Sequence, residues 1–266
     1  MKSAQTLITV LLILATTSWL VADEEGQKYL DQATEAKLNA RNFQQLEDVV
    51  NLAEKAIEEG LDEDGKEFAT QLITATLYQR AEQISNPLLS GRPPQQWVEM
   101  RRLALSDLVR LTKLNDEFAD AHLLIAKLQV LPGGDRKSGI ESATKAFQQY
   151  EDAEQKANAL IARAALRSDK AQQISDLSEA IKLDENNSDA LTARATIYTQ
   201  DNKFEKATED LQRLLEIDGD DVLAMSALAE ALARQNEFDK AIEIANQAIG
   251  KQPKSSAGYE LRARIH

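Results

Sequence analysis

The sequence predicts an all-α solenoid in which antiparallel helix pairs stack one after another. Three observations support this fold class. The 266 residues include only 10 Gly and 5 Pro, a composition that favours helix along most of the chain. The segment Ser188–Asp221 aligns without gaps with the next segment, Val222–Ser255, and a period of this length is typical of stacked repeats. Within each segment, two stretches with helical apolar spacing flank a short polar turn, which makes the two helices antiparallel.

Residues 1–22 are predicted to be a signal peptide. Lys2 precedes an uncharged apolar stretch, Leu7–Ala15, and an acidic segment follows Ala22, as expected around a cleavage site. We expect cleavage after Ala22 and an exported body that is periplasmic or secreted. The alternative is an uncleaved anchor formed by residues 4–22, whose length is close to that of a bilayer span. This anchor also places the body outside the cytoplasm.

Residues 23–116 are predicted to form divergent N-terminal helix pairs. Apolar periodicity indicates helices at 24–40 and 43–59. The stretch Ala104–Leu111 has the order of small, acidic and apolar residues that marks a second helix in the regular units. Between these helices, the proline-rich segment Ser85–Gln95 is expected to be the longest loop of the chain.

The regular array is predicted for residues 117–266. Small residues recur where two helix axes approach, such as Ala195 and Ala229 one period apart. The units are about 117–153, 154–187, 188–221, 222–255 and a partial unit, 256–266. The unit from Val222 resembles the tetratricopeptide repeat. Its order of large apolar and small residues, ending in Pro, follows that family's pattern at Met225, Leu228, Ala229, Leu232, Ala241, Ala245 and Pro253.

The resemblance covers nearly all of the chain after residue 22 and is strongest from residue 117. It implies a right-handed superhelix whose first helices line a concave groove that binds peptides or helices of partner proteins. The groove candidates are Asp189, Thr192, Thr196, Gln200, Ser226, Glu230, Arg234, Glu260 and Arg264. They lack the Lys and Asn with which the family clamps a peptide carboxylate, so chaperone C-terminal tails are not expected as partners. Because residues 256–266 hold half a unit, the chain is interpreted as the N-terminal part of a longer array.

Charges that occur together in the repeats predict two ion pairs at helix seams. Arg163 and Arg194 occupy the same place in two first helices, and the second helices carry Asp176 and Asp210 one residue before a core Leu. The next unit has apolar residues at both places. A guanidinium can satisfy a carboxylate with two parallel hydrogen bonds, so we expect Arg163 to pair with Asp176 and Arg194 with Asp210, in a structural role.

The composition disfavours most kinds of chemistry. The chain has no Cys, and its two His are His122, expected to pack in the core, and the last residue, His266. Neither a metal site nor a cofactor is therefore expected. The sequence contains no nucleophile or phosphate-loop motif, and no catalytic residue is assigned. A net charge of −13 disfavours binding to nucleic acid and to anionic membrane surfaces.

The sequence therefore predicts an exported scaffold that binds a protein or peptide partner and is not an enzyme, with no small-molecule substrate. A membrane tether is expected only if residues 4–22 stay attached. The alternative is a recruiting domain of a larger enzyme whose catalytic domain lies beyond His266.

Overall fold

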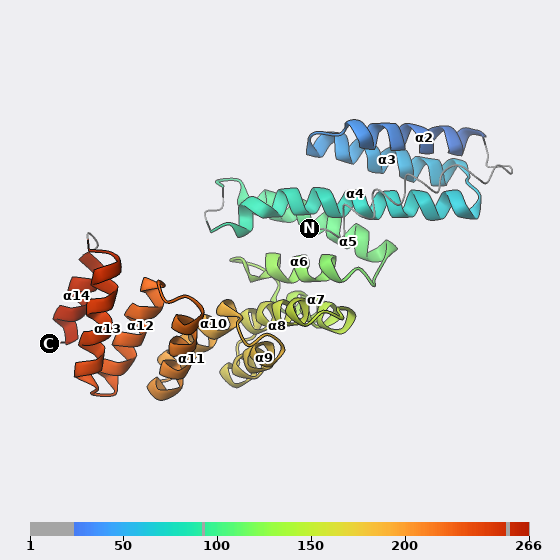
Figure 1. The fold of residues 1–266 in the computed structure, drawn as a ribbon. Coiled ribbons are helices and arrows are strands. Elements are labelled where there is room, and N and C mark those ends of the chain that lie inside the picture. Colours follow the sequence, from blue (N-terminus) through green and yellow to red (C-terminus); the bar gives the residue numbers. More distant parts are fainter. Residues whose placement is uncertain (1–23, 92–93, 254–255, 266) are drawn as a thin grey trace. The chain divides into compact units, whose positions relative to one another are not determined.

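The computed structural model describes residues 24–91, 94–253 and 256–265, which form α-helices and no strand (Figure 1). The predicted signal peptide, residues 1–22, lies outside these ranges. The helices are α2 (Glu24–Asn39), α3 (Phe43–Glu59), α4 (Glu63–Leu89), α5 (Trp97–Leu114), α6 (Ala119–Val130), α7 (Arg136–Gln149), α8 (Ala153–Leu166), α9 (Lys170–Leu183), α10 (Ser188–Gln200), α11 (Phe204–Ile217), α12 (Val222–Arg234), α13 (Phe238–Lys251) and α14 (Ser256–Ile265). The prediction of an all-α fold is confirmed.

The chain divides into two compact units, with the boundary between Leu128 and Gln129, inside α6. In the N-terminal unit, α2 packs on α3, α3 on α4, and α4 on α5. Apolar residues three and four apart on one face of each helix form its core, where Leu46, Leu77 and Leu108 are fully buried. No helix in the described part of the chain is long and apolar enough to cross a membrane.

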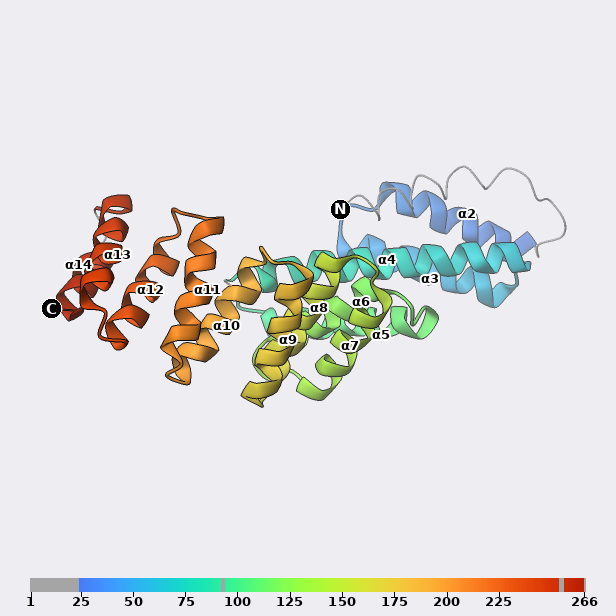
Figure 2. The same cartoon turned by 60° about the horizontal axis from the view of Figure 1, so that its bottom comes forward.

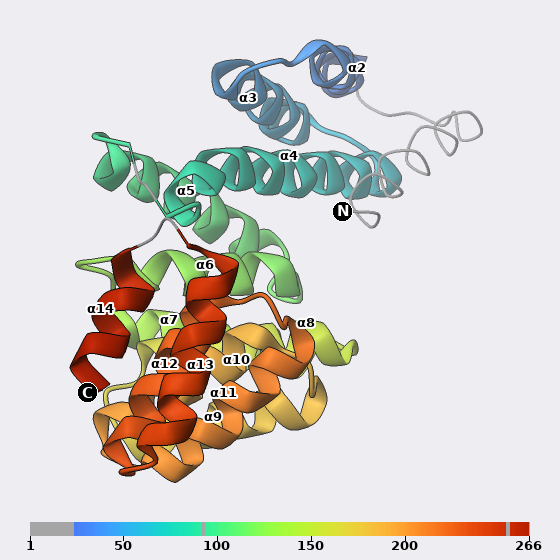
Figure 3. The ribbon, with the colours of Figure 1, turned by 60° about the vertical axis from the view of Figure 1, so that its left-hand side comes forward.

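The longest helix of the N-terminal unit corrects one expectation. Instead of giving way to a loop at Ser85, α4 continues through Pro87 and ends at Leu89. Figure 3 shows α4 as one long helix. Proline lacks a backbone N–H and removes one hydrogen bond from this last turn. Ile84 and Leu88 are almost completely buried there, and burial of two large apolar side chains outweighs the loss of one hydrogen bond.

The C-terminal unit is a continuous stack of antiparallel helix pairs. The pairs are α8 with α9, α10 with α11, and α12 with α13; α7 packs on α8, and α14 packs on α13 and α12 (Figure 2). Alanine lines the helix crossings, and Ala164, Ala195 and Ala229 are almost or completely buried at the same register of three first helices. Side chains of this size let the helix axes approach closely enough to share one core.

Helix starts are set by short acidic and amide side chains. Seven described helices begin after an Asp or Asn whose side chain accepts a hydrogen bond from a backbone N–H of the first turn, which satisfies donors that have no partner inside the helix. These residues are Asn42, Asp62, Asp135, Asp152, Asp169, Asn187 and Asp221.

The turns inside the two regular units repeat one backbone motif. Asn202 and Asn236, one period apart, have φ angles of 56° and 63°. The N–H of Lys203 donates to the carbonyl of Tyr198 at 2.8 Å, and the N–H of Glu237 donates to that of Leu232 at 2.9 Å. These bonds close a Schellman motif, in which asparagine tolerates the left-handed conformation better than most residues.

Candidate protein-interaction surface

The two predicted ion pairs lie at the seams between first and second helices. Arg194 of α10 donates to both carboxylate oxygens of Asp210 on α11, at 2.9 Å from Nε and 2.6 Å from Nη2. Arg163 of α8 donates in the same way to Asp176 on α9, at 3.0 and 2.7 Å. Both carboxylates are buried. The hydrogen bonds to Asp210 raise the pKa of Arg194 above its ordinary value, so the guanidinium of Arg194 stays charged at neutral pH.

Each of these arginines also reaches back to the preceding helix. The Nη1 of Arg194 donates to the Ser178 hydroxyl of α9 at 3.0 Å, and that of Arg163 donates to the Thr144 hydroxyl of α7 at 3.3 Å. One guanidinium therefore links three helices. Asp176 also accepts a bond of 2.5 Å from Arg167, a partner that the repeat pattern did not indicate because other units lack this arginine.

A third seam of the same kind occurs between α4 and α5 and was missed in the sequence. Arg80 precedes a buried alanine, as Arg194 does, and donates at 2.9 Å to Asp107, which precedes a core leucine, as Asp210 does. The sequence did contain the pattern of this seam, in the dipeptides Arg80-Ala81 and Asp107-Leu108. This pattern was overlooked because the two residues are 27 positions apart, whereas Arg194 and Asp210 are 16 apart.

The third seam is part of a larger charged cluster. Glu47 of α3 pairs with Arg80 and, at 3.1 Å, with Arg110, which also bonds to Glu54 at 2.9 Å. One oxygen of Asp107 and the Nε of Arg80 are buried without a hydrogen-bond partner. Burial, only partly offset by Arg80, raises the pKa of Asp107 to about 6. This seam is less completely satisfied than the seams of the C-terminal unit.

The groove candidates lie on the outward faces of α10, α12 and α14, the first helices of successive units. We call them the first-helix row. All are exposed except Ser226, which is partly buried. The Thr196 and Ser226 hydroxyls each bond to a carbonyl of their own helix at 2.8 Å, leaving oxygen lone pairs to accept further bonds.

The sequence analysis missed the most exposed apolar residue of this face. Leu223 of α12 is 83% exposed and occupies the register of Asp189 on α10. A solvent-exposed leucine at a helix start has no role in the core. We include Leu223 in the first-helix row, where it is an apolar side chain among polar ones. The sequence did indicate that Leu223 is exposed, because it aligns with Asp189, which is a groove position and not a core position.

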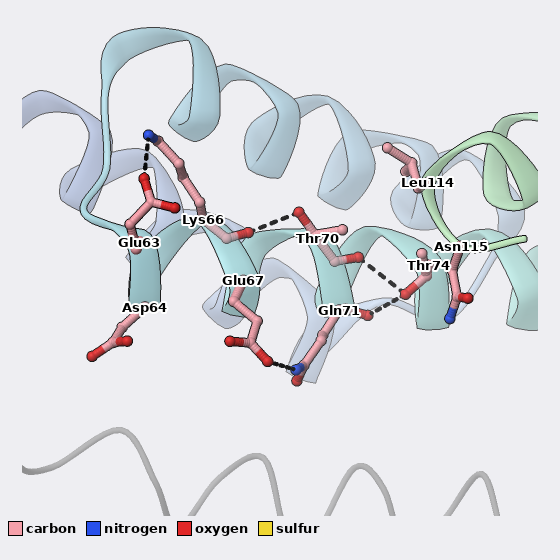
Figure 4. A pocket seen from close by; sticks show the side chains of 9 residues that line it. All are labelled: Glu63, Asp64, Lys66, Glu67, Thr70, Gln71, Thr74, Leu114 and Asn115. Atoms are coloured by element: carbon pink, nitrogen blue, oxygen red, sulfur yellow. Dashed lines mark hydrogen bonds and ion pairs between the residues drawn. The ribbon is translucent and has the colours of Figure 1, made fainter. Parts of the chain in front are cut away.

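A shallow depression in the N-terminal unit follows the first half of α4, beside the end of α5 (Figure 4). Its polar side chains are largely satisfied along the helix: Lys66 bonds to Glu63 and Gln71 to Glu67, each at 3.0 Å. The described residues contain no group of three or more His, Asp or Glu side chains that could hold a metal ion. We therefore assign no ligand to this depression.

The regular stacking of its helix pairs defines this chain as a helical-repeat protein. Residues 198–265 match the family model described as tetratricopeptide repeat. This match covers the last regular units of the chain, which therefore have the sequence pattern of the tetratricopeptide repeat. No curated protein matches the sequence at a significant level.

Solved structures of low sequence identity share the fold. The crystal structure of MamA protein is 19% identical, with 69% of this chain and 96% of that chain covered and a TM-score of 0.54. YrrB, described as a TPR protein with an unusual peptide-binding site, is 16% identical, with coverages of 71% and 91% and a TM-score of 0.54. PilF of Pseudomonas aeruginosa is 11% identical, with coverages of 91% and 98% and a TM-score of 0.53.

Proposed function

We propose that this chain is an exported scaffold that binds an extended peptide or a helix of a protein partner along the first-helix row and catalyses no reaction. The proposal rests on exposed side chains that recur at matching registers of α10, α12 and α14, together with the exposed Leu223 at the start of the middle helix. The peptide-binding site named in the description of YrrB is consistent with this use of the fold.

The chemistry of the row favours a partner with both apolar and basic side chains. Leu223 offers an apolar contact at the start of α12. Asp189, Glu230 and Glu260 place one carboxylate on each of the three helices, in a chain whose net charge is −13. Arg234 and Arg264 follow two of these carboxylates by one helical turn. A partner with alternating charge therefore suits the row better than a purely acidic one.

The test is a selection of displayed peptides on the full chain, followed by measurement of affinity by fluorescence anisotropy. Leu223→Asp should weaken binding of the selected peptides at least tenfold, because it replaces the apolar contact at the start of α12 by a charge. The matched control is Ile217→Asp, which makes the same change at a partly exposed position at the end of α11. Equal losses in the two variants, or no loss in either, would contradict binding along the row.

Export is a separate part of the proposal and rests on the N-terminal sequence. The basic start at Lys2, the apolar stretch Leu7–Ala15 and the acidic segment after Ala22 are the parts of a cleavable signal peptide. N-terminal sequencing of the protein from the envelope or the medium should begin at Asp23. A protein recovered only from the cytosol with Met1 intact would contradict export, without bearing on the binding row.

A further inference from the structure

The seam between α4 and α5 leaves a buried carboxyl group only half satisfied. Helices α3, α4 and α5 pack in series (Figure 1), and Arg80 of α4 bonds to a carboxylate on each of its two neighbours. Its Nη1 donates both to Glu47 of α3 and, at 2.9 Å, to Asp107 of α5. Because one nitrogen serves two carboxylates, the second oxygen of Asp107, Oδ2, is buried without a hydrogen-bond partner.

The aspartates of the two C-terminal seams are bonded through both oxygens. Arg194 donates from Nε and Nη2 to the two oxygens of Asp210, and Arg163 donates in the same way to Asp176. Arg80, in contrast, divides one nitrogen between two carboxylates. An ionised carboxylate that keeps a buried oxygen without a donor is costly, whereas a proton on that oxygen removes the charge.

The charged groups around Asp107 give the cluster an excess of negative charge. Arg80 of α4 and Arg110 of α5 favour the ionised form of Asp107, while Glu47 of α3 opposes it. Glu54 of α3 bonds to Arg110 at 2.9 Å. Three carboxylates therefore face two guanidinium groups. The cluster has a net charge of −1 when all of them are ionised and is neutral when Asp107 holds a proton.

The remaining helix packed on α4 contributes a neutral contact. At the contact between α2 and α4, Lys37 donates to the amide oxygen of Gln79 at 2.6 Å. The charges that act on Asp107 are those of Glu47, Arg80 and Arg110. A proton on Asp107 thus makes the cluster neutral without the movement of any helix.

We propose that the seam between α4 and α5 is a pH switch that is closed in acid. With a proton on Oδ2 of Asp107, the cluster is neutral and α5 stays packed on α4. When the proton is lost, α5 opens locally around Asp107 so that water can reach the carboxylate. The seams of the C-terminal unit stay closed over the same pH range, because their aspartates are already bonded through both oxygens. The switch makes the packing of the N-terminal unit alone respond to the pH of its surroundings.

The pH range of the switch follows from the closed and open forms of the seam. Burial raises the pKa of Asp107 in the closed seam to about 6, and hydration in the open seam returns it to about 3.9. Opening therefore releases a proton between these two values, so the open form gains population as the pH rises. The equilibrium constant for opening should rise about 50-fold from pH of about 4 to pH of about 7, most steeply below about 6.

The test is hydrogen exchange of the full chain at several pH values, with each rate divided by the intrinsic rate of an unprotected amide at the same pH. Protection of the α5 amides around Asp107 should fall about 50-fold between pH of about 4 and about 7. The α11 amides around Asp210 are the internal control and should not lose protection in this range. A fall of less than about threefold in α5, or an equal fall in α11, would overturn the proposal.

Three variants identify the group that titrates. Asp107→Asn has no carboxyl proton to lose, so protection of α5 should no longer fall with pH. Glu47→Gln removes the negative charge that opposes ionisation of Asp107 and leaves Arg80 with a single carboxylate, so the fall should shrink by at least about half. The matched control is Asp48→Asn, which removes an exposed carboxylate from the next position of α3 and should keep the full fall.

The comparison of Glu47→Gln with Asp48→Asn remains decisive if Asp107→Asn does not fold. Equal falls in these two variants, or an undiminished fall in a folded Asp107→Asn variant, would show that the charged cluster does not control the seam and would overturn the proposal.

Discussion

The ion pair between Arg194 and Asp210 holds α10 and α11 together at their seam. Asp210→Ala removes both hydrogen bonds that hold the guanidinium of Arg194 and leaves only its bond to Ser178. Loss of one partner of a buried pair costs about 3–5 kcal/mol. Because the Arg194 side chain remains 19% exposed, water reaches part of the stranded charge. We therefore expect the lower end of that range, about 3 kcal/mol.

Two further variants separate the charge from the packing. Asp210→Asn keeps the shape and one acceptor but loses the charge, and should cost about 1.5 kcal/mol. The double variant Arg194→Leu with Asp210→Ile copies the apolar pair Leu228 and Ile244 of the next unit. Apolar replacement of a buried ion pair is often neutral, so the double variant should lie within about 1 kcal/mol of the original chain. The single variants Arg194→Leu and Asp210→Ile should each cost about 3 kcal/mol, and the cycle should then give a coupling energy of about 5 kcal/mol.

The assay is chemical denaturation followed by circular dichroism, complemented by hydrogen exchange across residues 188–221. Local exchange is needed because one unit of a repeat array can open without the rest. A reciprocal control places Arg at Leu228 and Asp at Ile244: the Arg change alone should destabilise, and the pair should recover part of the loss. If the losses at Arg194 and Asp210 simply add in the double variant, the two residues do not stabilise the seam together and the reasoning is refuted.

Three other predictions concern local structure. Because burial raises the pKa of Asp107 to about 6, above about 3.9 in an unfolded chain, the native state holds this proton more tightly. The free energy of unfolding from this group should therefore fall by about 2 kcal/mol as the pH rises from about 4 to about 7, and Asp107→Asn should flatten the profile; parallel profiles would contradict this. At the left-handed turn, Asn202→Gly should leave the midpoint of thermal unfolding nearly unchanged, whereas Asn202→Val should cost about 1–2 kcal/mol; equal midpoints would argue against strain. A Cβ at Gly26 would lie 1.7 Å from the Gly60 carbonyl oxygen, whereas one at Gly250 would meet nothing within 4 Å. Hydrogen exchange of α2 should accelerate in Gly26→Ala, and exchange of α13 should not accelerate in Gly250→Ala; an unchanged α2 would disprove the close approach.

The regular units were predictable because each seam is encoded within a short window. Arg163 and Asp176 are 13 residues apart, and Arg194 and Asp210 are 16 apart, so a comparison of adjacent units shows both members changing together. Helix starts and turns are equally local, since one Asp or Asn side chain sets each of them.

The N-terminal unit was less predictable because its contacts join distant parts of the chain. Burial of Ile84 and Leu88 stabilises the last turn of α4, so the helix continues past Pro87. Because α4 is this long, Arg80 and Asp107 are 27 residues apart in the sequence. Arg110 reaches Glu47 over 63 residues, a separation at which no repeat alignment indicates pairing. These contacts depend on tertiary packing, which outweighs local propensity.

The measurement that tests the central claim most directly is a map of where a selected peptide lies on the chain. A photoreactive phenylalanine analogue is placed in turn at Thr196 and Leu223 in the first-helix row, and at Lys206 and Asp239, which are exposed on α11 and α13. Each protein is irradiated with the tightest peptide from the selection, and the crosslinked residues are identified by mass spectrometry. Binding along the row predicts crosslinks from Thr196 and Leu223 and none from Lys206 and Asp239. Crosslinks that come only from α11 and α13, or equally from all four positions, would contradict it.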